Sequence, residues 1–260
     1  MERIMRGFRR SFLVFLSCLI LTVTSIKAEP LPNTVLKVKP SIVGIGTFMP
    51  TRSPQNLFLG TGFVVANGQY IVTNAHVVAK PLASEKLEKW AIYVTKNNKP
   101  KLAYVDKIII DEIHDIAILK LVKGRLPALK LATSQAREGK LYAFTGYPIG
   151  MILGLYPVTH RGIISAISPV AIPAYNSTKL DSNLIGRLRD PFYVYQLDAT
   201  AYPGNSGSPL YDVETAEVIG VINKVFVKES KENVLSKPSG ITYAIPIEHV
   251  KKLLISKGLY

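Results

Sequence analysis

The chain has 260 residues, of which 48% are hydrophobic and 19% charged; this composition excludes a disordered tail, and the length allows one or two domains. The formal net charge of +14 allows contact with anionic surfaces, but charge that serves only solubility is the favoured interpretation. The lysines are scattered, however, and are not interleaved with aromatic residues, so we expect no specific nucleic-acid binding. The 18 Gly and 17 Pro residues are spread along the chain, which favours short strands joined by turns over long helices.

The first 28 residues have the layout of a secretory signal peptide. Four arginines precede residue 11, residues 11–26 carry no charge, and the small residue Ala28 follows. The uncharged run is shorter than the roughly 20 residues that a membrane-spanning helix needs. We therefore predict cleavage near Ala28, at a bond that the sequence leaves open, and a periplasmic or secreted protein. A retained membrane anchor at residues 11–26 is the alternative.

The single cysteine, Cys18, lies inside this uncharged run. Once the signal peptide is removed, the chain has no cysteine. Disulfides, thiol catalysis and thiolate metal sites are then excluded. A chain of this size can instead rely on its hydrophobic core for stability. We expect no metal ion and no other cofactor.

Residues 29–39 contain Pro30 and Pro32 and are predicted to be a linker. After them, runs rich in β-branched residues recur at short intervals with turn signals such as Asn67-Gly68, which predicts an all-β sandwich or barrel. The runs form two sets separated by a break at residues 132–139, and a helix is predicted between Pro246 and Gly258. The expected strands cover residues 42–48, 62–66, 70–73, 90–95, 102–110 and 116–122 in the first set, and residues 141–147, 158–167, 192–197, 218–227 and 241–245 in the second.

Ser206 is the candidate nucleophile. It lies between Gly204 and Gly207 in a segment that is too rich in Gly and Pro for a helix or a central strand, so a tight turn is expected. A turn of this kind can present a hydroxyl together with backbone N–H groups, which is what attack on an amide carbonyl requires. We predict an oxyanion hole over Gly204–Asn205–Ser206, with the N–H groups of Gly204 and Ser206 as donors. A Gly/Ser turn without chemistry is the alternative.

His76 is the best candidate for the general base. It follows a predicted strand that stops at Asn74, and the end of a strand can project a side chain from a rigid frame. A packed core histidine is the alternative reading. The other histidines fit less well: His249 falls on the polar side of the terminal helix, His160 falls inside a strand, and His114 directly precedes another candidate.

Asp115 is the candidate that orients the base. It stands at the start of an apolar strand, where burying a carboxylate is costly unless it has a partner. His76 would be that partner, and Asp115 would stabilise its cation. The rival acids, each more typical of a turn or a surface, are Asp106, Asp111 and Asp198.

Together these segments resemble the trypsin-like serine peptidases, and most closely their HtrA/DegP-like branch. The resemblance rests on TNAHVV at residues 73–78, DIAIL at 115–119 and PGNSGSPL at 203–210, in the family's order of His, Asp and Ser. It extends over roughly residues 40–254. It implies two six-stranded β-barrels, one in residues 40–134 and one in 135–260, with the active site in the cleft between them.

The resemblance also implies the mechanism. Ser206 would attack the scissile carbonyl while His76 takes its proton and Asp115 orients His76. The N–H groups of Gly204 and Ser206 would hold the oxyanion, and water would then resolve the acyl-enzyme. The chain departs from the family in having Ser208 where a second Gly is usual, and we expect this change to be tolerated.

Two further departures concern regulation and assembly. The branch normally continues into PDZ modules, whereas the sequence stops at Tyr260, so we expect no PDZ-based activation in this chain. The segment before the His motif, residues 49–59, is short for a loop that reaches another subunit. The oligomeric state, monomer or trimer, therefore stays open.

The specificity pocket follows from position relative to the nucleophile. Thr200 should lie at its base, Asn223 and Lys224 should belong to the strand along which substrate pairs, and Ile241 should line a wall. Because no acid stands at the base, we expect a small or medium apolar residue before the cut, not Lys or Arg.

The sequence thus predicts a secreted serine endopeptidase that cleaves polypeptides, in protein quality control or on extracellular or host proteins. A binding protein or chaperone on a protease fold, with a latent active site, is the main alternative. An esterase or transpeptidase with the same nucleophile and a structural β-barrel are the others.

Overall fold

The computed structural model describes residues 30–96, 99–148, 156–170, 191–223 and 240–260. Contacts divide the chain after residue 30, and the description below concerns the unit formed by residues 31–260. The predicted signal peptide and the alternative anchor at residues 11–26 lie outside the described residues. Within the described ranges, none of the helices is both long and apolar enough to cross a bilayer.

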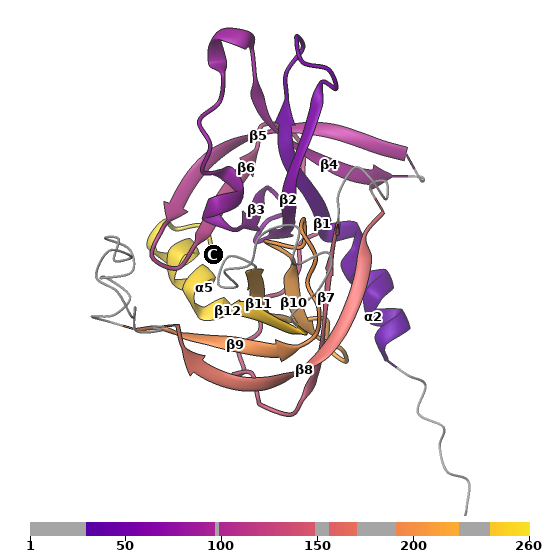
Figure 1. Ribbon diagram of the computed structural model, residues 1–260, viewed down its shortest axis with the longest axis vertical. Helices are drawn as coiled ribbons and strands as arrows, with labels where there is room; N and C mark the ends of the chain where they lie inside the picture. Colours follow the sequence, from indigo (N-terminus) through magenta and orange to yellow (C-terminus); the bar gives the residue numbers. More distant parts are fainter. Residues whose placement is uncertain (1–29, 97–98, 149–155, 171–190, 224–239) are drawn as a thin grey trace, which may run out of the picture. The chain divides into compact units, whose positions relative to one another are not determined.

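The first half of the chain forms a closed antiparallel barrel of six strands (Figure 1). Hydrogen bonding runs in the order β1-β2-β3-β6-β5-β4, and β4 closes the barrel by pairing with β1. Two 3-10 turns, η2 (Ala75–Val78) and η3 (Ser84–Lys86), connect β3 to β4. The strands are β1 (Ile42–Phe48), β2 (Asn56–Val65), β3 (Tyr70–Thr73), β4 (Lys89–Lys96), β5 (Lys99–Asp111) and β6 (Ile116–Leu121).

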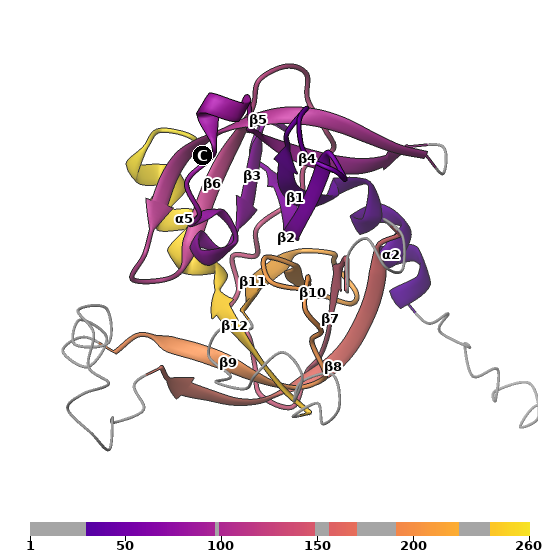
Figure 2. The same ribbon diagram turned by 45° about the horizontal axis from the view of Figure 1, so that its top comes forward.

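The second half forms another closed six-stranded barrel, in the order β10-β11-β12-β9-β8-β7, followed by the terminal helix α5 (Ile247–Ser256) (Figure 2). The expected all-β fold of two barrels is confirmed. One strand was missed: β10 follows the Ser206 turn and has only four residues. The strands are β7 (Leu141–Gly146), β8 (Val158–Pro169), β9 (Tyr193–Asp198), β10 (Pro209–Asp212), β11 (Val218–Asn223) and β12 (Ile241–Pro246).

The linker predicted over residues 29–39 is wrong for most of its length. The helix α2 (Leu31–Val38) occupies it and is followed by a 3-10 turn, η1 (Lys39–Ser41). Pro32 stands in the first turn of α2, where a missing N–H costs nothing. Thr34 and Val38, one helical turn apart, are buried, and the Thr34 hydroxyl donates to the carbonyl oxygen of Val213 at 2.8 Å. These contacts offset the conformational entropy that the segment loses when it forms a helix. The eight residues of α2 alone did not predict a helix.

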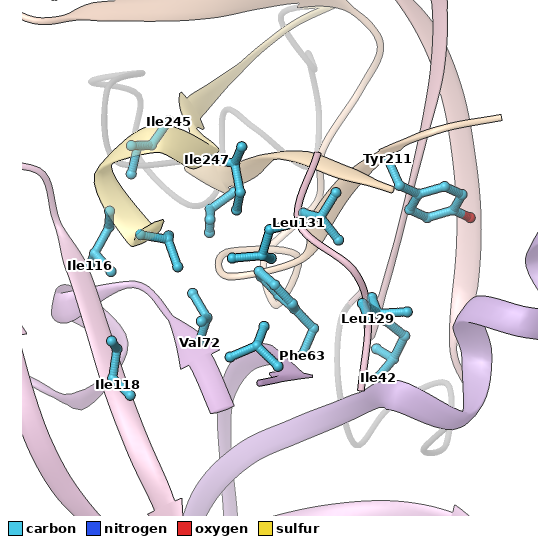
Figure 3. Close-up of a cluster of buried hydrophobic side chains, with 14 of the residues drawn as sticks. Ile42, Phe63, Val72, Ile116, Ile118, Leu129, Leu131, Tyr211, Ile245 and Ile247 are labelled. Carbon is cyan, nitrogen blue, oxygen red and sulfur yellow. The ribbon is translucent and has the colours of Figure 1, made fainter. Parts of the chain in front are cut away.

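Strand β6 is buried on both faces, and its alternation divides its side chains between two cores. Ala117 and Leu119 point into the interior of the first barrel. Ile116 and Ile118 point the other way, into a cluster that also contains side chains of the second barrel such as Ile245 (Figure 3). Because both faces of β6 are packed, the position of the residue before it, Asp115, is fixed by the core.

The segment between the barrels is hydrogen-bonded to both of them. The N–H of Leu129 donates to Val64 of β2 at 2.9 Å, and the N–H of Ala132 donates to Val218 of β11 at 2.8 Å. Leu129 and Leu131 add their side chains to the shared cluster (Figure 3). The two barrels therefore share one core in addition to their own interiors, and residues at their junction are held on a rigid frame.

Candidate active site

His76 and Asp115 are paired twice across the mouth of the first barrel. The backbone N–H of His76, in η2, donates to Oδ1 of Asp115 at 2.8 Å. Its ring Nδ1 lies 2.6 Å from Oδ2 of the same carboxylate. The structure thus brings together the predicted base and the predicted orienting acid.

This pairing fixes the tautomer of the imidazole. An ionised carboxylate only accepts hydrogen bonds, so Nδ1 of His76 must carry the proton. Nε2 is then left with a free lone pair, which is the form required of a general base. The His76 side chain is 30% exposed, whereas that of Asp115 is 11% exposed, so the base is accessible while its partner is shielded.

The backbone of Asp115 contributes to the same arrangement. Its φ of 53° lies in the left-handed region, which Asp tolerates better than most residues. Its carbonyl oxygen accepts from the N–H of Ala75 at 3.2 Å and from Nδ2 of Asn74 at 3.0 Å. Main-chain and side-chain contacts of one residue thereby lock the start of β6 to the segment that carries His76.

Asn223 completes the surroundings of the carboxylate from the second barrel. It ends β11, is fully buried, and its Nδ2 donates to Oδ2 of Asp115 at 2.6 Å. The sequence argument placed Asn223 on the substrate strand and gave its side chain no other role. The signal was nonetheless present, because a polar residue that ends an all-apolar strand needs a buried partner. Asp115 is that partner.

The Ser206 turn is fastened to β2 of the first barrel. The carbonyl oxygen of Ser206 accepts from the N–H of Thr61 at 2.9 Å, and that of Gly204 accepts from the Thr61 hydroxyl at 2.7 Å. Gly204 and Gly207 have φ values of 99° and 87°, which L-residues rarely adopt. The N–H of Gly207 donates to Ile222 at 2.9 Å, so both barrels hold the turn.

The backbone donors of this turn differ in their availability. The N–H of Asn205 donates to the carbonyl oxygen of Tyr202 at 3.0 Å and is therefore occupied. Within the described residues, the N–H groups of Gly204 and Ser206 have no hydrogen-bond acceptor. Of the three residues expected to form the oxyanion hole, these two have N–H groups free to meet a developing negative charge.

The segments that carry His76 and Ser206 approach each other around Gly60. A Cβ at Gly60 would lie 2.9 Å from Cγ2 of Val77, the residue after His76, and 3.1 Å from the carbonyl oxygen of Ser206. Gly60 therefore lets the two segments come close. In the part of the chain that the structure describes, no hydrogen bond joins the Ser206 hydroxyl to His76, which is common for this contact before substrate binds.

A sequence model of the trypsin-like peptidase domain matches residues 60–221, which include His76, Asp115 and Ser206. The chain belongs to the trypsin-like peptidase family. Its relatives include probable periplasmic DegP-like serine endoproteases of Halomonas elongata and Hahella chejuensis, 32% and 33% identical over 199 residues. These alignments cover 76% of this chain but 34% and 35% of the relatives, so the chain spans about a third of their length. The HtrA/DegP-like resemblance is confirmed.

Solved structures agree on the fold of this trypsin-like domain. The active form of the Rv3671c protease from M. tuberculosis covers 90% of this chain, and the match covers 88% of that protease. The TM-score is 0.63 at 24% identity, which supports the shared two-barrel architecture and nothing finer.

Ser208, the local departure from the family pattern, is accommodated by a glycine on β7. Ser208 is fully buried, and a Cβ at Gly146 would stand 2.0 Å from its Oγ and 2.9 Å from Oδ1 of Asn205. The absence of a side chain at Gly146 therefore provides the room that the Ser208 hydroxyl occupies.

The structure describes three of the four residues predicted to form the specificity pocket, namely Thr200, Asn223 and Ile241. Ile241 begins β12 opposite Asp198 of β9 and is 50% exposed, and Thr200 follows two residues after Asp198 and is half-buried. This register brings Ile241, the predicted wall of the pocket, close in the sheet to the segment that carries Thr200, its predicted base. Lys224 lies outside the described residues.

The remaining histidines pack against aromatic rings. His160 stacks on Phe144 inside the second barrel with centroids 4.9 Å apart, and burial lowers the pKa of its imidazole. The sequence argument placed His249 on the polar face of α5. It is instead half-buried against His114, and the centroids of the two rings are 4.0 Å apart. The helical pattern alone did not show that the turn before Asp115 covers that face.

Thr61 offers a direct test of how the nucleophile turn is held. Its hydroxyl donates to Gly204 and accepts from the N–H of Tyr147 at 3.0 Å, so Thr61→Val removes both hydrogen bonds. We expect a loss of about 1–3 kcal/mol of unfolding free energy and a fall of about tenfold in kcat/KM, equivalent to ~1.4 kcal/mol. Urea unfolding and peptide hydrolysis measure the two effects. Thr34→Val, which removes the buried hydroxyl that bonds to Val213 and not to the turn, should lower stability but leave kcat/KM unchanged.

Proposed function

We propose that this trypsin-like domain is a serine endopeptidase in which Ser206 is the nucleophile, His76 the general base and Asp115 the residue that orients it. The observation that carries the proposal is the double pairing of His76 with Asp115, at 2.8 and 2.6 Å. It leaves Nε2 as the acceptor on an accessible imidazole whose neighbour Val77 meets the Ser206 turn at Gly60.

In the proposed reaction, Oγ of Ser206 bonds to the scissile carbonyl carbon as its proton passes to Nε2 of His76. The carbonyl becomes an oxyanion that accepts from the N–H groups of Gly204 and Ser206. The C–N bond then breaks, and His76 returns the proton to the leaving amine. Water, deprotonated by His76, attacks the acyl-enzyme and releases the acid together with free Ser206.

Asp115 and Asn223 support the charge that this cycle creates. The Asp115 carboxylate accepts from the N–H and Nδ1 of His76 and from Nδ2 of Asn223, so the imidazolium forms beside a fixed negative group. The free backbone donors of the Ser206 turn act on the oxyanion, and each donor of this kind contributes about 10²–10³ in turnover.

Polypeptides are the proposed substrates, with a small or medium apolar residue before the cut. The uncharged Thr200 and the exposed apolar Ile241 support this preference. Profiling with a peptide library should give cleavage mainly after residues such as Ala or Val. Cleavage mainly after Arg or Lys would refute the assignment.

We also propose a periplasmic or secreted location and a role in protein quality control or on extracellular proteins. The basic and then uncharged N-terminal sequence supports export, and the relatives named above are described as periplasmic. A latent protease-fold binding protein is the second candidate, because the Ser206 hydroxyl and His76 share no hydrogen bond among the described residues.

One experiment separates the two candidates. The purified protein is incubated with casein and with an active-site fluorophosphonate, beside Ser206→Ala as the control. A peptidase should cleave casein and take the label, and the variant should do neither. Absence of both reactions in the unaltered protein would contradict the peptidase and favour the binding protein.

A further inference from the structure

Three aromatic rings gather over the turn that leads into Asp115. The imidazoles of His114 and His249 stack with centroids 4.0 Å apart at 28°. Phe192 packs edge-on against both of them, with centroids 4.8 and 5.2 Å away. The rings come from the β5–β6 turn, from α5 and from the residue before β9. The stack therefore fastens the turn of the first barrel to the terminal helix.

The position of His114 within the turn is itself fixed. Asp111 accepts from the N–H of His114 at 3.1 Å with one carboxylate oxygen, and its other oxygen lies 2.7 Å from Nδ1 of the ring. Although burial raises the pKa of Asp111, these hydrogen bonds from His114 bring it below its ordinary value. Asp111 and the stack thus hold His114 from two sides.

The residue after His114 is Asp115, whose backbone has a φ of 53° and whose two carboxylate oxygens meet His76. A small shift of the turn would change those contacts directly. We propose that His114 and His249 are positioning residues for Asp115, and that their stack holds the turn only while His249 is uncharged. This inference rests on the proposed peptidase function. It adds that acid lowers the activity of the same site through His249.

The charges around His249 support this role. Asp111 and His114 face it from the turn and Lys252 from α5, while the segment before β9 contributes the uncharged Phe192. Burial above all, then His114 and Lys252, lower the pKa of His249 to about 4, against the opposing effect of Asp111. A proton on His249 would place a positive charge in a half-buried stack beside Lys252, and this charge would weaken the stack.

The sign of the pH effect follows from this shift. The folded pKa of His249 is about 4 and the ordinary value is 6.5, so between these values the unfolded chain binds more protons. The stability that neutral His249 contributes is complete above pH 6.5 and is lost as the pH falls toward 4. In the folded protein His249 gains its proton only near pH 4, and there the proton that opens the stack would also release Asp115.

The test compares His249→Ala and His249→Phe in the full protein. Phe keeps a ring in the stack but cannot be protonated, and the described residues include no hydrogen bond of the His249 side chain that it would break. At about pH 8, His249→Ala should lower kcat about tenfold with KM little changed, whereas His249→Phe should stay within about twofold of the unaltered enzyme. Val250→Ala, which removes a fully buried side chain from the same helix, should lower stability without changing kcat.

The pH profile supplies the decisive contrast. As the pH falls through 4, kcat/KM of the unaltered enzyme should fall by up to about tenfold more than that of His249→Phe, because only the unaltered enzyme can bind a proton at residue 249. Superimposable profiles of these two enzymes, or an unchanged kcat in His249→Ala, would overturn the proposal. If the unaltered enzyme has no turnover at any pH, the proposed function fails. The pH dependence of thermal unfolding then tests the stack. Between pH 6.5 and 4 the melting temperature should fall less in His249→Phe than in the unaltered protein.

Discussion

Replacing Asp115 with Asn is expected to lower kcat/KM about 10⁴-fold while leaving the barrels folded. Both carboxylate oxygens accept hydrogen bonds from His76, and Asn223 donates to one of them. An amide has a single acceptor oxygen, so one of these donors would face an NH₂ group. If that group faces the ring, Nδ1 becomes the acceptor and Nε2 carries the proton, which removes the base. Peptide hydrolysis kinetics and a thermal melt of the variant measure activity and fold.

The control is Asp106→Asn on β5. Asp106 is an exposed acid that the sequence offered as a rival to Asp115, and it lies opposite Lys120 in the β5–β6 ladder. Its substitution should leave kcat/KM within about twofold, as is usual for surface changes of under ~0.5 kcal/mol. A fall of less than tenfold in Asp115→Asn would count against Asp115 as the orienting residue.

Gly207→Ala is expected to be among the most destabilising substitutions in the chain. The φ of Gly207 is 87°, and a Cβ there would stand 2.0 Å from the carbonyl oxygen of Thr61 and 2.5 Å from Oγ1 of Thr73. The first of these atoms belongs to the backbone of β2, which also anchors Ser206, so it cannot move aside without displacing the nucleophile. We expect a loss of about 4 kcal/mol or more, with at least a hundredfold fall in kcat/KM, measured by urea unfolding and peptide hydrolysis.

Gly124→Ala separates the clash from the backbone strain. Gly124 has a closely similar φ of 83°, but no heavy atom lies within 4 Å of the position of a Cβ. This variant should lose only the cost of the left-handed conformation, about 1 kcal/mol, and keep full activity. If the two variants lose equal unfolding free energy, backbone strain, and not the contact with Thr61, accounts for the effect of Gly207→Ala.

Most strands could be predicted because their β-branched runs end at clear turn signals. Residues 42–48 and 70–73 match β1 and β3 residue for residue. Strand β10 was missed because four residues directly after the Ser206 turn show too little alternation, and pairing with β11 and β7 is what extends them. Helix α2 was missed for a similar reason: its stability comes from Thr34 and Val38 packing on distant residues, not from its own propensity.

The sequence by itself predicted the chemistry that we propose for this protein. His76, Asp115 and Ser206 occur in motifs specific enough to indicate a peptidase, because a nucleophile, a base and an orienting acid need those residue types in turns and at strand ends. The two closed barrels, confirmed by the structure, were implied by the same resemblance, whereas the spacing of the strands left a sandwich or a barrel open.

Only the tertiary structure decided how these residues are held. Asn223 meets Asp115 across 108 positions of sequence, and Thr61 fixes Gly204 across 143. Contacts of such range depend on how two closed barrels share one core, which no local pattern encodes. The ring stack of His114 and His249 has the same origin, since it joins α5, which follows the last strand of the second barrel, to the turn before Asp115 in the first barrel.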